Sequence, residues 1–217
     1  MYDDSRLINS VYNTFLVSSI LAILFNATSQ IVNNLVIGNA ISSEKLSVTG
    51  LVLPIYYVFA TLGNMMGIGG SILCSKLIGQ GCFERCKHAF TVTYVFTVAV
   101  SMALGALTFL MLPQIIPLLG TPEALYHDVY QYAAVMCVGG VFTACIYLAF
   151  NFLRLDAKAL SAMLVFVVMA ALGAGLDYVF VVRMGLGLFG VSLATSIAAA
   201  AASVMGALIL FLKGDSV

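Results

Sequence analysis

A single carboxylate deep in an apolar stretch is the first residue of this sequence to which chemistry can be assigned. Asp177 follows a charge-free run over residues 159–176, and the next charge, Arg183, comes six residues later. In a helix that spacing puts the two side chains on different faces, so Arg183 is not the natural partner of Asp177. A carboxylate kept from bulk water is costly unless it faces protein or a wet cavity, where it can bind a proton or a cation. We therefore predict an ion- or proton-coupling site at Asp177, with a structural acid bonded to a neighbouring helix as the alternative.

Three amides share one face of an early apolar segment. Asn26, Gln30 and Asn33 follow i, i+4, i+7 spacing, which aligns side chains along a helix. If this segment spans a membrane, its amides must face protein or water. The stripe therefore lines a cavity or forms interhelical hydrogen bonds, and the spacing fits both. All three are candidate cavity or substrate-binding residues.

Tyr132 and Thr195 have simpler interpretations from the residues alone. A tyrosine near the end of an apolar helix is typical of an interfacial aromatic belt, and a threonine within a helix usually bonds to its own backbone. The sequence has no HExxH, P-loop or GxSxG motif. Cys82, Cys86 and His88 lack a fourth ligand and match no zinc spacing. We expect no catalysis and no bound metal or cofactor.

The composition indicates what surrounds these residues. Of 217 residues, 62% are apolar and only 8% are charged, and the formal net charge is zero. A soluble domain carries about 25% charged residues, a nucleic-acid-binding surface needs a basic patch, and disorder needs low hydrophobicity. The composition therefore excludes a soluble enzyme, a nucleic-acid partner and a disordered chain. It predicts a protein that crosses the lipid bilayer several times.

Long charge-free runs predict six transmembrane helices. A spanning helix needs about 20 apolar residues, whereas a β-barrel would show short alternating segments. We expect an all-α membrane fold in a single domain over residues 1–217. Pro113 and Pro117 are expected to end the third helix, and Thr121 to cap the fourth. The predicted helices cover residues 11–37, 46–73, 90–112, 123–152, 160–182 and 187–212.

The basic residues predict the orientation. Six spans place both termini on one side of the membrane, and seven of the nine basic residues then share that side, with only Lys45 and Arg183 opposite. Because cytoplasmic loops are enriched in Lys and Arg, both termini are expected in the cytoplasm, with the chain in the plasma or inner cell membrane. The seven residues are Arg6, Lys76, Arg85, Lys87, Arg154, Lys158 and Lys213.

Short motifs run through nearly the whole chain in a characteristic order. They are Gln30–Gly38, Gly50–Ile55, Gly67–Ser71, Gly79–Gly81, Phe152–Asp156, Leu176–Phe180 and Gly185–Thr195. The ordered set, more than any single motif, resembles the first half of MATE transporters, the multidrug and toxic compound extrusion family.

The resemblance implies one six-helix lobe of a twelve-helix transporter that works by alternating access around a central cleft. Family members export organic, often cationic compounds in exchange for H⁺ or Na⁺. The implied partners are therefore a small organic substrate, the bilayer, and a second six-helix lobe, either a missing half or a second copy. Asp177 would be the buried carboxylate of the lobe, and Tyr132 and Thr195 its cavity partners.

Three features depart from the family pattern, one of them the absence of a proline that often bends the first helix near Ser18. Asn33 stands where an aspartate is common, and Gly173 stands where an asparagine is common. An amide cannot take up a proton, so the implied ion site is reduced to one acid. The alternative function is a degenerate or scaffold lobe without transport of its own.

Overall fold

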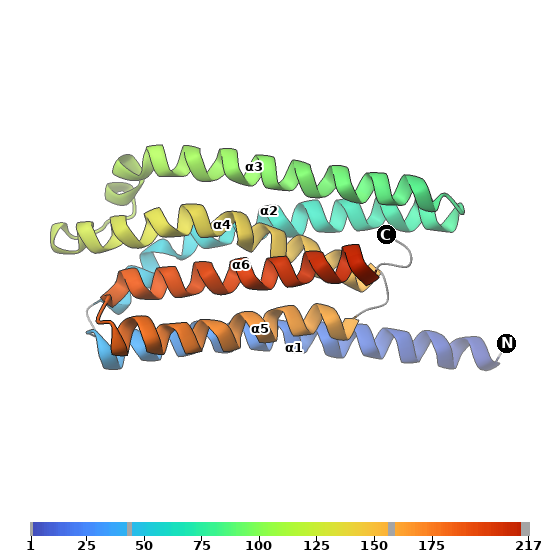
Figure 1. Cartoon of the computed structure of the whole chain (residues 1–217), viewed down its shortest axis with the longest axis horizontal. Helices are drawn as coiled ribbons and strands as arrows, with labels where there is room; N and C mark the ends of the chain where they lie inside the picture. Colours follow the sequence, from blue (N-terminus) through green and yellow to red (C-terminus); the bar gives the residue numbers. More distant parts are fainter. Residues whose placement is uncertain (1, 43–44, 156–158, 214–217) are drawn as a thin grey trace.

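The computed structural model describes residues 2–42, 45–155 and 159–213, and in these ranges it contains six helices long and apolar enough to cross a bilayer. The prediction of six spans is therefore confirmed. The loop residues Ser43, Glu44, Asp156 and Lys158 lie outside the described residues. The helices, which run side by side in Figure 1, are α1 (Tyr2–Ala40), α2 (Leu46–Gly79), α3 (Phe83–Leu118), α4 (Tyr126–Leu155), α5 (Ala159–Asp177) and α6 (Gly187–Lys213).

The two ends of the bundle differ in their basic residues. The start of α1, the turn between α2 and α3, and the end of α6 lie at the same end (Figure 1). Lys76, Arg85 and Lys87 belong to that end, whereas Lys45 and Arg183 belong to the other. The charge bias assigns the first end to the cytoplasm. We call it the inner end and the opposite one the outer end.

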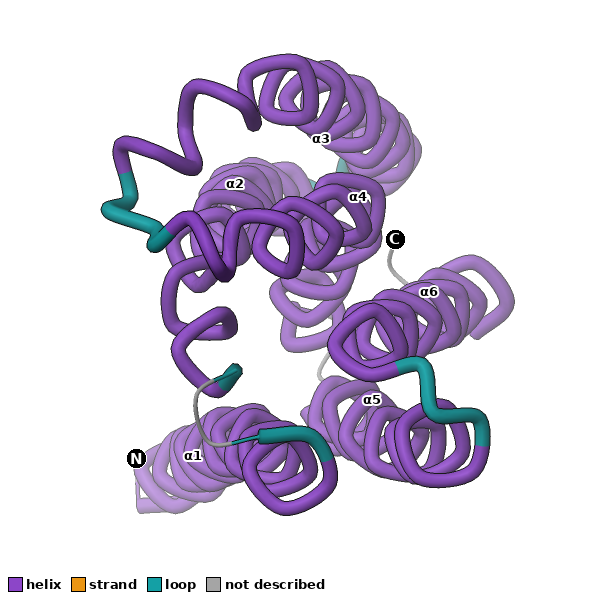
Figure 2. Tube along the Cα trace, turned by 90° about the vertical axis from the view of Figure 1, so that its left-hand side faces the viewer, coloured by secondary structure: helices purple, strands orange, loops and turns teal. Residues whose placement is uncertain are grey.

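Helix α4 is the centre of the lobe. In Figure 2 it lies between α2, α3 and α6, and 61% of an 18-residue apolar window of its span is buried, against 11% for α1. Glycines allow this close packing: a Cβ on Gly63 would meet the backbone of Ala144, and one on Gly140 would meet the ring of Phe59. Small residues permit such approaches in lipid, where apolar burial alone does not drive helices together.

Helix α1 is attached to the rest of the lobe mainly through α5. It contacts α2 along few residues, although the two are consecutive in the chain. The two helices stand apart in Figure 2. The two consecutive helices are therefore not packed against each other along their length.

Two local predictions at the outer end were wrong. Helix α3 continues through Pro113 and Pro117 to Leu118, because proline has a helical φ and each one removes only one backbone hydrogen bond. Thr121 caps no helix: its Oγ1 is buried without a hydrogen-bond partner in the described chain. A short 3₁₀ turn, Glu123–Leu125, begins instead at Pro122, whose carbonyl accepts from the Leu125 N–H (2.9 Å).

Candidate functional site

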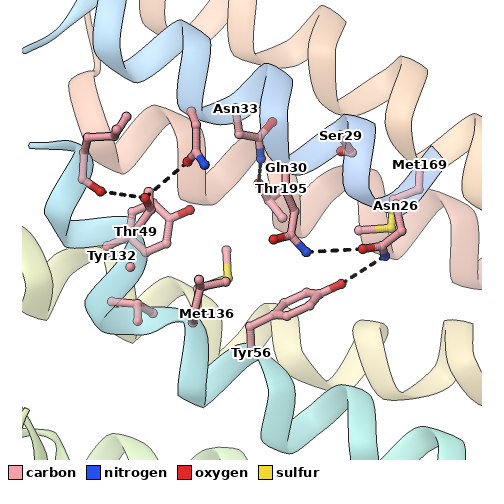
Figure 3. Close-up of a pocket in the computed structure, with 15 residues that line it drawn as sticks. Asn26, Ser29, Gln30, Asn33, Thr49, Tyr56, Tyr132, Met136, Met169 and Thr195 are labelled. Atoms are coloured by element: carbon pink, nitrogen blue, oxygen red, sulfur yellow. Dashed lines mark hydrogen bonds between the residues drawn. The ribbon is translucent and has the colours of Figure 1, made fainter. Parts of the chain in front are cut away.

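A pocket without charged side chains lies between α1 and α2. Residues of α4, α5 and α6 form its back wall (Figure 3). It opens where α1 and α2 make little contact with each other. Its lining comprises Asn26, Ser29, Gln30, Asn33, Asn34, Leu46, Thr49, Gly50, Val52, Leu53, Tyr56, Tyr132, Met136, Met169 and Thr195.

The candidate residues come together around this pocket, from helices distant in sequence. Asn26, Gln30 and Asn33 line it from α1, Tyr132 from α4 and Thr195 from α6. The sixth candidate, Asp177, is not part of the lining. It lies behind Asn33, at the end of α5.

Asp177 is fully buried, with 0% of its surface exposed. Its Oδ1 has no hydrogen-bond partner in the described chain, and its Oδ2 lies 2.6 Å from the side-chain amide of Asn33. The ion pairs of the described residues, Lys45–Asp128 (2.8 Å) and Lys87–Glu84 (3.8 Å), do not include it. Among the described residues, Asp177 is therefore a buried acid without a counter-ion.

The Asn33 amide joins α1 to α5 and α6. Amide nitrogen and oxygen are told apart by their neighbours. With the nitrogen toward Asp177, Nδ2 donates to Asp177 Oδ2 (2.6 Å) and to the Ser29 carbonyl (3.1 Å), and Oδ1 accepts from Thr195 Oγ1 (3.2 Å). With the amide turned over, Nδ2 donates to Thr195 Oγ1 (3.2 Å). Both orientations connect Asn33 to Thr195.

The helix widens directly after Asp177. Residues Tyr178–Arg183 form a π-helical turn, in which the Met184 N–H donates to the Val179 carbonyl (3.0 Å). Such turns are rare and occur frequently at functional sites. Asp177 is thus the last residue of the regular part of its helix, at a point where the backbone pattern changes.

A second hydrogen-bonded cluster closes the inner end of the pocket. Asn26 Nδ2 donates to the hydroxyls of Tyr147 (3.2 Å) and Tyr56 (3.4 Å), and its Oδ1 accepts from Gln30 Nε2 (3.2 Å). Figure 3 shows the chain from Gln30 through Asn26 to Tyr56. Both interpretations left open by the sequence thus apply to Asn26, which lines the pocket and also bonds α1 to α2 and α4.

Tyr56 and Tyr147 were not predicted as site residues. Tyr56 follows Thr49 by seven residues, so both lie on one face of α2 and both line the pocket. Tyr147 precedes Asn151 by four residues on α4, and Asn151 donates to Asn64 on α2 (3.2 Å). These i, i+7 and i, i+4 polar pairs are the signal that could have identified the two tyrosines.

Comparison with known proteins identifies the fold. The MatE family model matches residues 18–179. The multidrug export protein MepA of Staphylococcus saprophyticus is 26% identical over 204 residues, which cover 92% of this chain and 44% of that protein. A solved MOP superfamily transporter from Pyrococcus furiosus aligns with a TM-score of 0.87 at 19% identity, over 95% of this chain and 45% of the other.

A solved multidrug resistance MATE family transporter in an outward-facing conformation aligns with a TM-score of 0.82 at 22% identity, over 95% of this chain and 46% of the other. The chain thus spans less than half the length of the proteins it matches. Six spans, their order and the extent of the family match together lead to one conclusion: the chain belongs to the MatE family of multi-pass membrane transporters and corresponds to its N-terminal six-helix lobe.

Proposed function

We propose that the chain is one half of an alternating-access exporter, in which the pocket belongs to the substrate path and Asp177 carries the coupling proton. One observation carries this proposal: a fully buried carboxylate, with no counter-ion in the part of the chain that the structure describes, lies directly behind a pocket-lining amide. Ionisable groups inside membrane spans are costly and mark ion or substrate pathways. The convergence of eight further polar side chains on the same pocket favours transport over a scaffold role.

The surroundings of Asp177 favour a proton over Na⁺. Hard cations take several oxygen ligands at once. The Asn33 amide lies 2.6 Å from the carboxylate, and its N–H groups repel a cation when they face it. Gly173, one turn before Asp177, contributes no side-chain ligand. A proton needs only one oxygen, and Asp177 Oδ1 has no other partner in the described chain.

The lining of the pocket defines the proposed substrate class. Amides and hydroxyls can bind polar groups, and Tyr56, Met136 and Met169 offer aromatic and soft apolar surface. Such a mixture fits amphipathic organic compounds, including cations whose charge rests on an aromatic face. The cavity measures about 210 Å³, below the roughly 300–1,000 Å³ of pockets that enclose drug-sized ligands. We propose that a second lobe supplies the remaining cavity volume.

The proposal is tested by Asp177→Asn in membrane vesicles that contain the chain with its second lobe. We expect proton-driven efflux of an organic cation to fall at least tenfold, because an amide cannot take up the proton, while the amount of protein in the membrane stays the same. Replacing Na⁺ by K⁺ should leave the wild-type rate unchanged.

Asp128→Asn is the matched control. It makes the same substitution at an acid that pairs with Lys45 at the outer end, 22% exposed and away from the pocket lining. It should retain most of the efflux. Equal rates for wild type and Asp177→Asn would overturn the assignment.

A further inference from the structure

A second cavity, of about 420 Å³, lies between the outer halves of α4 and α6. Its lining residues are separate from those of the pocket. We call it the outer groove, and its walls include Tyr130, Gln131, Val138 and Phe142 of α4 and Phe189 and Leu193 of α6.

The groove follows one face of α4 that is exposed only in its outer half. Gln131, Val138, Cys145 and Phe152 recur at intervals of seven, so they lie on the same face of the helix. Gln131 and Val138 are exposed, Val138 with 67% of its surface. Cys145 and Phe152, nearer the inner end, are buried.

An aromatic contact covers this face of α4 at the inner end. The ring of Phe90 on α3 lies 4.8 Å from that of Phe152 on α4 and 5.3 Å from that of Phe211 on α6, between centroids. Helices α3 and α6 thus meet over α4 at the inner end, and the groove is confined to the outer half of the lobe.

The length of the groove matches one leaflet of a bilayer. Twelve residues separate Tyr130 from Phe142, which is roughly 18 Å along a helix that rises about 1.5 Å per residue. The hydrocarbon core of a bilayer is about 30 Å thick, so one leaflet contributes about 15 Å. The groove therefore extends from near the membrane surface to near the middle of the bilayer.

Below Gln131 the groove is suited to hydrocarbon. Apolar residues line it together with Ser196, whose hydroxyl already donates to the Ser192 carbonyl of its own helix (2.9 Å). Water in such a space would lack the polar partners it needs, and an empty space would lose dispersion contacts. An acyl chain in the groove would contact α4 and α6 at the same time.

The outer end of the groove is polar. Gln131 Nε2 lies 2.9 Å from His127 Nε2, one turn earlier, and both side chains are exposed. Beside them the rings of Tyr126 and Tyr130 stack with 6.5 Å between centroids, and tyrosines are typical of the membrane–water interface. Amide and imidazole N–H groups can donate to phosphate and ester oxygens. The groove thus combines an apolar length with a polar mouth at the surface.

We propose that the outer groove binds one phospholipid of the outer leaflet, with an acyl chain between α4 and α6 and the phosphate or ester oxygens at Gln131 and His127. The site goes beyond the proposed transport function, because it requires neither Asp177 nor the pocket. It lies on the back of a wall that α4 and α6 form together, where a Cβ on Gly139 would meet the Ser196 hydroxyl.

The groove and the pocket face different directions. Met136 lines the pocket and Val138 lines the groove, and two residues along a helix turn by about 200°. Figure 2 shows α6 on the side of α4 away from the gap between α1 and α2. A second lobe over the mouth of the pocket therefore leaves the groove facing lipid.

Photo-crosslinking of the purified chain in vesicles of phosphatidylethanolamine and phosphatidylglycerol tests the site. The probe is phosphatidylglycerol with a diazirine at the end of one acyl chain, and mass spectrometry locates the label. We expect residues 189–196 of α6 to be labelled at least several-fold more than Leu107. That residue is the reference because it is 55% exposed on the outer half of α3 and outside the groove.

Two pairs of exposed variants connect the label to the groove. Val138→Phe fills it and should reduce labelling of residues 189–196 at least threefold. Val58→Phe is the control, since Val58 is 50% exposed and lies twelve residues into α2, as Val138 does in α4. Gln131→Leu removes the polar mouth and should reduce labelling at least twofold, whereas Gln114→Leu, at an exposed position near the outer end of α3, should not.

Four results would contradict the proposal. Equal labelling of the groove and of Leu107 means that the groove holds no more than the surrounding lipid. Unchanged labelling in Gln131→Leu removes the assigned headgroup contact. Loss of the label when the second lobe is added means that protein covers the groove. Displacement of the label by tetraphenylphosphonium means that the groove takes organic cations instead of phospholipid.

Discussion

At the scale of single residues, Asn26 joins α1 to α2 and α4 at the pocket. Three hydrogen bonds join it to Gln30, Tyr56 and Tyr147. We expect Asn26→Leu to lower the free energy of unfolding by about 2 kcal/mol, from about 0.6 kcal/mol for each of three side-chain bonds in a membrane protein. Unfolding in mixed detergent micelles measures the change.

Asn39→Leu is the matched control for this prediction. Asn39 lies on the same helix but is exposed, and within the described chain its Nδ2 bonds to the Leu35 carbonyl of its own helix (2.9 Å). The loss in free energy of unfolding should be several times smaller for Asn39→Leu than for Asn26→Leu. Similar losses at both positions would mean that the cluster adds no stability beyond the helix itself.

The polar residues show what could be read from the sequence and what could not. The i, i+4, i+7 spacing predicted that Asn26, Gln30 and Asn33 share a face, and the structure places them along one side of the pocket. Their partners come from other helices, because Tyr147 is 121 residues from Asn26 and Thr195 is 162 from Asn33. Spacing along one helix carries no information about the helix that faces it.

At the scale of elements, glycines decide how closely α2 approaches α4. A Cβ at Gly63 would collide with backbone atoms of Ala144, which cannot move aside as a flexible side chain can. We expect Gly63→Ala to destabilise the lobe by about 1–3 kcal/mol, the usual cost of overpacking. Gly69→Ala, six residues on in a position with nothing within 4 Å of the new methyl, should instead be neutral or stabilising by up to about 1 kcal/mol.

Thermal or detergent unfolding of the two alanine variants checks this difference in sign. A loss of stability at both positions would mean that alanine is disfavoured in α2 for reasons other than contact with α4. The comparison is direct, because both glycines belong to one helix and the substitution is the same.

Element boundaries were harder to predict than element number. Hydropathy specified six spans, because lipid demands long apolar helices. The π-helical turn after Asp177 and the passage of α3 through Pro113 and Pro117 were not predicted. Both depend on how neighbouring helices accommodate irregular backbone hydrogen bonds, which local sequence rules do not describe.

At the scale of the whole molecule, the pocket lies between two helices that are not packed against each other. The chain spans less than half the length of its relatives, and the mouth of the pocket lies between α1 and α2, which scarcely touch each other. A polar opening of this kind is costly against lipid. We therefore expect a second six-helix lobe, or a second copy of this chain, to cover it.

Single cysteines in a background without the five native ones test this arrangement. Gly50→Cys lies at the mouth of the pocket and Gly175→Cys on α5 away from the pocket lining; both positions are exposed, and neither has an atom within 4 Å of an added Cβ. If a second copy covers the mouth, mild oxidation in membranes should produce a dimer linked through Gly50→Cys in at least several-fold excess over Gly175→Cys. If a separate lobe covers the mouth of the pocket, adding that lobe should slow maleimide labelling at Gly50→Cys but not at Gly175→Cys. Equal reactivity of both cysteines in both experiments would mean that the pocket faces lipid or water, and that the lobe does not pair through this side.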